Sequence, residues 1–283
     1  MKKINVLVLI GYGINCDYET GDGFSLAERA SERAFHLGGA GTKRVHINDL
    51  IKGKESLDDY QILVFPGGFS YGDDIASGKV LANKIRINLG EKIQKFIGEG
   101  KLIMGICNGF QVMVKAGLLP GFDGDYRMQR TTLTFNDSGR FEDRWIYLRN
   151  DNDKCIFTQG IEKIYLPVAH GEGKFFAEES VLDKLQDNEQ LVFRYADEEG
   201  RPAGGRFPYN PNGSLRDIAG ICDSTGRVFG MMPHPERYLY FTNHPRWTRE
   251  KERLKRQGVP VPEYGEGLQI FKNALAYIKK NLI

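Results

Sequence analysis

Residues Lys101–Gly117 read KLIMGICNGFQVMVKAG, and this stretch predicts a strand, a sharp turn and a helix in succession. The apolar run Leu102–Ile106 has the length of a buried strand, and apolar residues recur at three- and four-residue spacing after Cys107. Glycine on both sides of Cys107 permits a tight turn, and Gly117 can close the helix. The pattern is that of the G-x-S-x-G nucleophile elbow, with cysteine in place of serine.

Cys107 is therefore a candidate nucleophile. The helix that follows it directs its positive end at the sulfur, which favours thiolate over thiol. A free thiol titrates near about 8.5, and sites of this kind lower that pKa to roughly 3.5–7.5. The alternative interpretation is a small buried core residue, which is the commoner role of a cytosolic cysteine. This stretch by itself leaves both interpretations open.

Strands alternate with helices around this stretch, most clearly up to about residue 120. The predicted strands are Ile4–Ile10, Arg44–Ile47, Gln61–Phe65, Leu133–Phe135, Trp145–Leu148, Lys163–Val168, Leu191–Tyr195, Asp217–Cys222 and Val228–Met232. The predicted helices run from a capping box at Ser25 to about Leu37, where Gly38-Gly39 would stop the helix, and over Val80–Ile97 and Gly267–Lys280. This order predicts an α/β fold with an open, mostly parallel sheet flanked by helices.

The composition restricts the class of protein. A chain of 283 residues can bury a sizeable core, in one large α/β domain or two small ones. The 39 basic and 37 acidic residues give a net charge of +2 and no reason to expect nucleic acid or a membrane as a partner. No apolar stretch reaches the roughly 18 residues of a membrane span. The N-terminal run Ile4–Ile10 has the pattern of a first strand and not of a signal peptide.

The four cysteines, at positions 16, 107, 155 and 222, are scattered and form no C-x-x-C pair. Neither a disulfide framework nor a zinc site is predicted from them, and a reducing cytoplasm is the expected compartment.

A second loop of interest, Pro66–Asp74 (PGGFSYGDD), follows a predicted strand. In an open parallel sheet, ligands bind at the carboxyl ends of the strands. Backbone N–H groups of this loop can form an oxyanion hole, and the alternative is an ordinary turn. The loop Gly11-Tyr12-Gly13 lacks the third glycine of a dinucleotide-binding motif, and the sequence has no phosphate-binding P-loop motif.

A cysteine nucleophile requires a base, and the base requires a group that orients it. Of the five histidines, His36 and His46 are predicted to be structural and His244 lies in a polar loop. His170 and His234 both follow apolar strands, but only His234 has a carboxylate, Glu236, held close by flanking prolines. The alternative is a chance histidine and glutamate in a surface loop.

These residues together predict acyl transfer. The thiolate of Cys107 attacks a carbonyl, and His234 protonates the leaving group. The N–H of Asn108 and one from Gly67–Phe69 stabilise the oxyanion. The residues alone do not name the bond that is cleaved.

A resemblance to a known family goes further. GICNGFQ at 105–111 and PHPE at 233–236 resemble the class I (triad) glutamine amidotransferases. Within that superfamily, NCD at 15–17, PGGFSYGD at 66–73, AHGEG at 169–173 and MPHPER at 232–237 are similar to the glutaminase subunits of phosphoribosylformylglycinamidine synthase, an enzyme of purine (IMP) biosynthesis. The resemblance implies a flavodoxin-like fold and a single glutaminase domain over residues 1–283.

The resemblance also implies roles for the matched residues. Cys107 would form a γ-glutamyl thioester, His234 would be the acid and base, and Glu236 would orient it. The oxyanion N–H groups would come from Gly68 and Asn108. The residues that would hold glutamine are Gln111, Ala169, His170, Gly171 and Glu172.

The partners implied are L-glutamine and a separate ATP-dependent synthetase subunit, which would receive ammonia through a channel. ATP and Mg²⁺ are expected in that subunit, and no cofactor or metal is expected in this chain. A small auxiliary subunit is compatible with the resemblance.

Extra segments near 207–215 and 241–263, compared with the usual stand-alone subunit, are predicted to dock the partner. From its charge pattern alone, the basic stretch Phe241–Val261 is predicted to be a solvated helical face, and a partner-binding patch is the alternative.

Two other functions remain open. One is an amidotransferase or cysteine hydrolase of the same fold in another pathway, against which PGGFSYGD and AHGEG argue. The other is a non-catalytic binding subunit, against which the intact Cys107, His234 and Glu236 argue. A stress-response or chaperone-like relative would not need the proline-bracketed histidine and glutamate. Turnover of glutamine discriminates among these functions.

Overall fold

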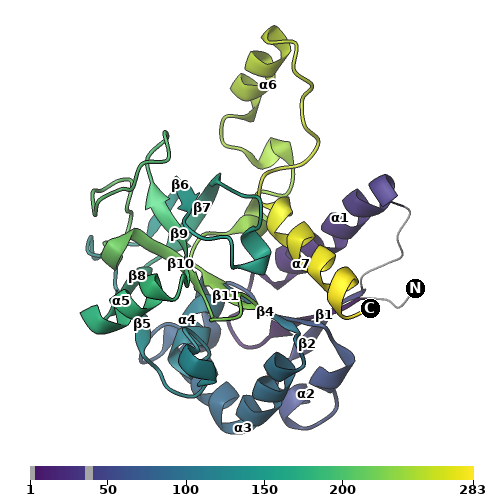
Figure 1. The fold of residues 1–283 in the computed structure, drawn as a ribbon, viewed down its shortest axis with the longest axis vertical. Coiled ribbons are helices and arrows are strands. Elements are labelled where there is room, and N and C mark those ends of the chain that lie inside the picture. Colours follow the sequence, from purple (N-terminus) through teal and green to yellow (C-terminus); the bar gives the residue numbers. More distant parts are fainter. Residues whose placement is uncertain (1–3, 36–40) are drawn as a thin grey trace.

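A computed structural model gives the fold of the protein (Figure 1). It describes residues 4–35 and 41–283, without the side chains of residues 28–35. Its centre is a nine-stranded sheet of the order β2-β1-β3-β4-β11-β10-β9-β6-β7. A separate antiparallel pair is formed by β5 (Thr131–Thr134) and β8 (Lys174–Ala177).

The strands of the large sheet, in spatial order, are β2 (Gly41–His46), β1 (Asn5–Ile10), β3 (Ile62–Phe65), β4 (Leu102–Ile106), β11 (Val228–Met231), β10 (Ile218–Cys222), β9 (Leu191–Ala196), β6 (Glu142–Asn150) and β7 (Lys163–His170). The helices are α1 (Asp17–Phe35), α2 (Ile47–Ile51), α3 (Lys79–Gly98), α4 (Asn108–Ala116), α5 (Glu179–Asp187), α6 (Trp247–Arg256) and α7 (Leu268–Asn281).

The first half of the sheet, from β2 to β11, is parallel. Its strand order is that of flavodoxin-like folds. Every residue of β3 and β4 is buried, as expected for apolar runs covered on both faces. Helices α1 and α7 lie on one face, where Phe24 meets Phe271 edge to face at 4.9 Å, and α3 and α4 lie on the other (Figure 1).

The second half of the sheet, from β11 through β10, β9 and β6 to β7, is antiparallel. The predicted α/β class, with helices on both sides of an open sheet, is confirmed. The antiparallel direction of the later strands was not predicted, since the chain order of strands does not reveal which strands pair.

Some element boundaries differ from the prediction. Helix α1 begins at Asp17, eight residues before the predicted capping box, and the Ser25 hydroxyl lies 3.2 Å from the Thr42 hydroxyl instead of capping a helix. The predicted helix stop at Gly38-Gly39 and the predicted structural role of His36 lie outside the described residues. Strand β8 and helix α5 were not predicted.

Helix α6 projects from the body of the molecule (Figure 1). None of its residues is buried, which is compatible with both a solvated helical face and a surface for a partner. Within residues 4–35 and 41–283, the structure contains no helix with the length and apolar character needed to cross a membrane.

Candidate active site

The loops that carry the predicted site residues converge at the carboxyl ends of the parallel strands. Cys107 follows β4, Gly68 follows β3, and His234 follows β11. The backbone N–H of Cys107 donates to Met231 O at 2.8 Å, and that of His234 donates to Pro167 O on β7 at 2.9 Å. These bonds tie the two loops to neighbouring strands and bring together residues that are far apart in the sequence.

Cys107 lies on a strained turn between β4 and α4. Its φ is +51° and its ψ is −108°, a conformation that a non-glycine residue rarely adopts. A Cβ at Gly109 would lie 1.8 Å from Phe65 O, and one at Gly105 would lie 2.4 Å from Met113 Sδ. The glycines therefore let α4 pack directly against β3 and β4, and the predicted elbow is present.

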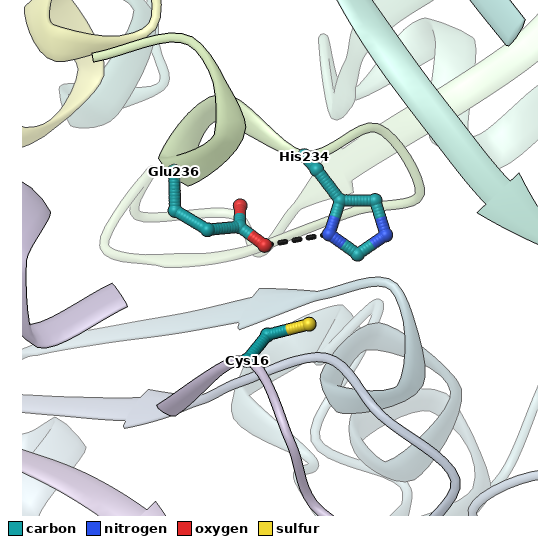
Figure 2. A group of neighbouring side chains, drawn as sticks. All are labelled: Cys16, His234 and Glu236. Atoms are coloured by element: carbon teal, nitrogen blue, oxygen red, sulfur yellow. Dashed lines mark hydrogen bonds and ion pairs between the residues drawn. The ribbon is translucent and has the colours of Figure 1, made fainter. Parts of the chain in front are cut away.

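His234 and Glu236 form a buried pair (Figure 2). Nδ1 of His234 lies 2.5 Å from Glu236 Oε1, and the two residues are 1% and 3% exposed. Within the described residues, Nε2 of His234 has no hydrogen-bond partner, nor does Oε2 of Glu236. The carboxylate therefore fixes the orientation of the ring and leaves Nε2 free for chemistry.

The charges around His234 favour its protonated form. Burial lowers the pKa of His234, but the Glu236 carboxylate and then the Cys107 sulfur outweigh burial and raise this pKa well above its usual 6.5. An imidazolium beside Cys107 stabilises a thiolate there. The site thus favours a protonated imidazole next to Cys107.

A cavity of about 140 Å³ opens beside Cys107. It is lined by all five residues predicted to hold glutamine and by Gly68, whose predicted role is in the oxyanion hole. It is also lined by residues with no predicted role, Asp73, Ser77, Phe135 and Phe141. Phe135 ends a predicted strand and Phe141 lies in a predicted loop, and neither position carried a functional signal in the sequence. The size of the cavity suits a small metabolite.

The loop predicted to hold glutamine is anchored to α4 and to Ser77, just before α3. The Gln111 side chain donates to Glu172 O at 2.7 Å, and the Glu172 carboxylate accepts from the Ser77 N–H at 3.1 Å. Lys115, which is buried, donates to Ser77 O at 2.6 Å and lies 3.7 Å from the Glu172 carboxylate. Asn108 donates to Gln111 Oε1 at 2.9 Å. The site wall is therefore a closed network of polar contacts.

His170 supports this wall with its side chain. Its Nδ1 lies 3.1 Å from Asn136 Oδ1 and its Nε2 lies 3.4 Å from Asn212 Nδ2, in the loop near 207–215. Burial is the main cause that lowers the pKa of His170 to about 3, so the ring is neutral. A neutral ring donates through Nδ1 and accepts at Nε2, which satisfies both neighbours.

The two predicted oxyanion donors flank Cys107. The Asn108 N–H begins α4 and has no acceptor within the helix. Among the described residues, neither this N–H nor that of Gly68 is used in the surrounding backbone hydrogen bonds. Gly68 has φ +142°, and a Cβ there would lie 2.7 Å from the backbone nitrogen of Asn15. Only glycine therefore fits at this position.

A second cavity, of about 170 Å³, lies on the His234 side of Cys107. It shares Gly68, Phe69, Cys107, Phe141 and Ala169 with the first cavity, and Asn15, Cys16, Asp143, His234 and Arg237 complete its lining. Nη2 of Arg237 donates to Cys16 Sγ at 3.4 Å. The motif NCD at 15–17 contained this cysteine, but nothing in the sequence assigned it a place beside His234.

Comparisons with known proteins agree with this geometry. Residues 3–278 match the family described as a CobB/CobQ-like glutamine amidotransferase domain. The chain is 50% identical over 276 residues to the phosphoribosylformylglycinamidine synthase subunit PurQ of Methanococcus maripaludis. The aligned region covers 97% of this chain and 97% of that relative. It is 47% identical over 281 residues to the protein of the same name from Dehalococcoides mccartyi, covering 99% of this chain and 100% of that relative.

Among solved structures, a chain of PurLQS from Thermotoga maritima is similar at a TM-score of 0.68 and 29% identity. The similarity covers 98% of this chain and 100% of that chain. Sequence and fold therefore point to the same group of relatives.

Proposed function

The chain belongs to the CobB/CobQ-like glutamine amidotransferase family, as a glutaminase subunit of phosphoribosylformylglycinamidine synthase, and we propose that Cys107, His234 and Glu236 carry out its hydrolysis of L-glutamine. The observation that carries this assignment is the strained Cys107 elbow beside a buried His234–Glu236 pair, with a cavity of about 140 Å³ next to the cysteine. This is the arrangement of a nucleophile, its base and the group that orients the base.

In the first step, the Cys107 sulfur attacks the side-chain carbonyl carbon of glutamine. A C–S bond forms, and the carbonyl oxygen becomes an oxyanion that accepts from the N–H groups of Gly68 and Asn108. The C–N bond then breaks as His234 transfers a proton to the nitrogen, which leaves as ammonia. A γ-glutamyl thioester remains on Cys107.

In the second step, His234 removes a proton from water, and the resulting oxygen attacks the thioester carbonyl. The C–S bond breaks, glutamate leaves, and the Cys107 thiolate is restored. Glu236 acts through both steps by holding the ring at Nδ1 and stabilising its charged form.

The walls of the 140 Å³ cavity would hold the substrate. Gln111, Ala169, His170, Gly171 and Glu172 line it, and we propose that they bind glutamine, His170 by fixing the loop. The hydrogen bonds of Gln111 and Glu172 hold the wall in place before glutamine arrives, which lowers the ordering cost of binding.

The partner of this subunit is the synthetase subunit of the same enzyme, the recipient of the ammonia. We propose that ATP and Mg²⁺ act in that partner and that this chain needs no cofactor for glutamine hydrolysis. A cytoplasmic location is part of the proposal, since all four cysteines are free thiols, as is usual in a reducing compartment.

Residues 1–283 are proposed to form one glutaminase domain, with the segment 241–263 as a docking element for the synthetase. Helix α6 supports this role because it projects from the body and buries none of its side chains.

The decisive experiment is mass-spectrometric mapping after treatment with a glutamine-like diazoketone, in the presence of the synthetase subunit and its nucleotide. We expect one adduct, on the Cys107 peptide, that excess glutamine blocks and Cys107→Ser abolishes. Failure to label Cys107 under these conditions would remove it as the nucleophile and favour a binding subunit without glutaminase activity.

A further inference from the structure

Three potential metal-binding side chains meet at one point of the active site (Figure 2). The Cys16 sulfur, a ring nitrogen of His234 and a carboxylate oxygen of Glu236 all lie within 4.8 Å of one another. The three residues are 2%, 1% and 3% exposed. Cys16 precedes α1 and is fixed through its backbone N–H, which donates to Gly67 O at 3.2 Å.

The chemistry of this set matches zinc. Thiolate, imidazole and carboxylate are the three ligand types that zinc takes in proteins, with Zn–S near about 2.3 Å and Zn–N near about 2.0 Å. Tetrahedral ligands at these distances are roughly 3.6 Å apart, so small side-chain rotations would close the cluster around an ion.

One of the available ligand atoms lacks a partner. Among the described residues, Glu236 Oε2 is buried without a hydrogen bond, and the ring nitrogen that faces this carboxylate is His234 Nδ1. Buried polar atoms without partners are uncommon, and each one needs an explanation. The bond from Oε1 that orients His234 explains neither the free Oε2 nor the second thiol beside the pair.

We propose that Cys16, His234 and Glu236 form an inhibitory binding site for a thiophilic divalent cation, of which Zn²⁺ is the best match. The 170 Å³ cavity lined by Cys16, Cys107 and His234 provides the entry and an open coordination position. Binding releases the protons held by the Cys16 thiol and the imidazole, because the metal takes the deprotonated ligands. A metal-bound His234 can no longer transfer a proton, so glutamine hydrolysis stops until the ion leaves.

Arg237 limits the strength of this site. Its guanidinium donates to Cys16 Sγ at 3.4 Å, which places a positive charge beside the ion. Arg237 itself is exposed to solvent. The site therefore fits a reversible inhibitor and not a resident cofactor. Mg²⁺ prefers oxygen ligands and does not compete for this set.

The first test measures glutaminase activity of the complex with the synthetase against increasing Zn²⁺. Each variant is compared with its own metal-free rate. Wild type and Cys155→Ser, which changes another buried thiol, should be inhibited alike and recover fully on chelation. Cys16→Ser should need at least about tenfold more Zn²⁺ for half-inhibition, since it loses a ligand. Equal sensitivity of Cys16→Ser, or no inhibition of wild type, would overturn the proposal.

The second test needs no activity. Co²⁺ is titrated into the full chain, and the sulfur-to-cobalt charge-transfer absorption is recorded. The band should appear in wild type and in Cys107→Ser, and it should be absent from Cys16→Ser and Cys16→Ala, with circular dichroism confirming that each variant is folded. A band that survives in either folded Cys16 variant overturns the site. Because Cys107→Ser keeps the band, this result stands apart from the success or failure of the diazoketone experiment.

Discussion

The carboxyl edge of the parallel strands and the projecting segment 241–263 differ in how far packing determines their side chains. At the sheet edge, Cys107, His234 and Glu236 are at most 5% exposed, and the glycines beside Cys107 leave no room for a Cβ. In α6 no residue is buried, and the ion pair Arg256–Glu252 is exposed to solvent. Catalysis requires side chains that are held in place to within a few tenths of an ångström. An exposed helix, in contrast, can change its side chains without disturbing the fold.

The largest effect on activity should come from a substitution of Cys107, which lies in the packed region. Cys107→Ser should lower glutaminase activity by at least about 10⁴-fold, because the nucleophile is lost while the cavity remains. Synthesis from externally supplied ammonia by the complex should be unchanged. Steady-state rates with glutamine and with ammonium measure both, and Cys155→Ser is the matched control. Equal loss of both activities would indicate misfolding or failed docking.

Glu236→Gln should have the next largest effect. The amide keeps the shape but removes the charge that raises the pKa of His234, so kcat/KM should fall by about 10²–10⁴-fold. The pKa of His234 should fall as well, which moves the corresponding limb of the pH–rate profile to lower pH. A profile of unchanged shape, reduced only in height, would contradict the electrostatic role of Glu236.

A smaller effect is expected on stability at the wall of the glutamine cavity. Folding lowers the pKa of His170 to about 3, so between pH 6.5 and 3 the unfolded state binds a proton that the folded state does not. Stability should therefore fall as the pH falls through this window, by about 2 kcal/mol at pH 5 for an unfolded pKa of 6.5. The raised pKa of His234 contributes to the pH dependence of stability only above about pH 6.5, where stability is lost as the pH rises.

Urea unfolding at pH 7 and pH 5, compared between wild type and His170→Gln, isolates the effect of His170. The variant should lose less stability between the two pH values. Identical losses in the two proteins would show that His170 is not held neutral in the folded state.

The smallest effect on folding should come from α6. Arg249→Glu with Lys255→Glu should change the free energy of unfolding by no more than about 0.5 kcal/mol, since both side chains are on an exposed helix. Binding to the synthetase, measured by titration calorimetry, should nevertheless weaken. Lys280→Glu, near the C-terminus of α7, is the control for a general change in charge. If complex formation and ammonia transfer survive deletion of 241–261, α6 has no docking role.

Much of the site could be predicted because its signals are local. A strand, a glycine-flanked cysteine and a helix are encoded within seventeen consecutive residues, and the histidine and its carboxylate are two positions apart. Local patterns of this kind dictate backbone geometry directly. The start of α1 was placed wrongly because a capping box at Ser25 also occurs inside a longer helix, where tertiary contacts override the local signal.

The α/β class, the elbow at Cys107 and the pairing of His234 with Glu236 follow from residues that are neighbours along the chain. The pairing of the later strands, the place of the His170 ring between two asparagines and the presence of Cys16 beside His234 depend on how whole elements pack. Cys16 and Arg237 are 221 residues apart in the chain yet in contact. Contacts of that range arise from the packing of whole elements, so no pattern within one segment can encode them.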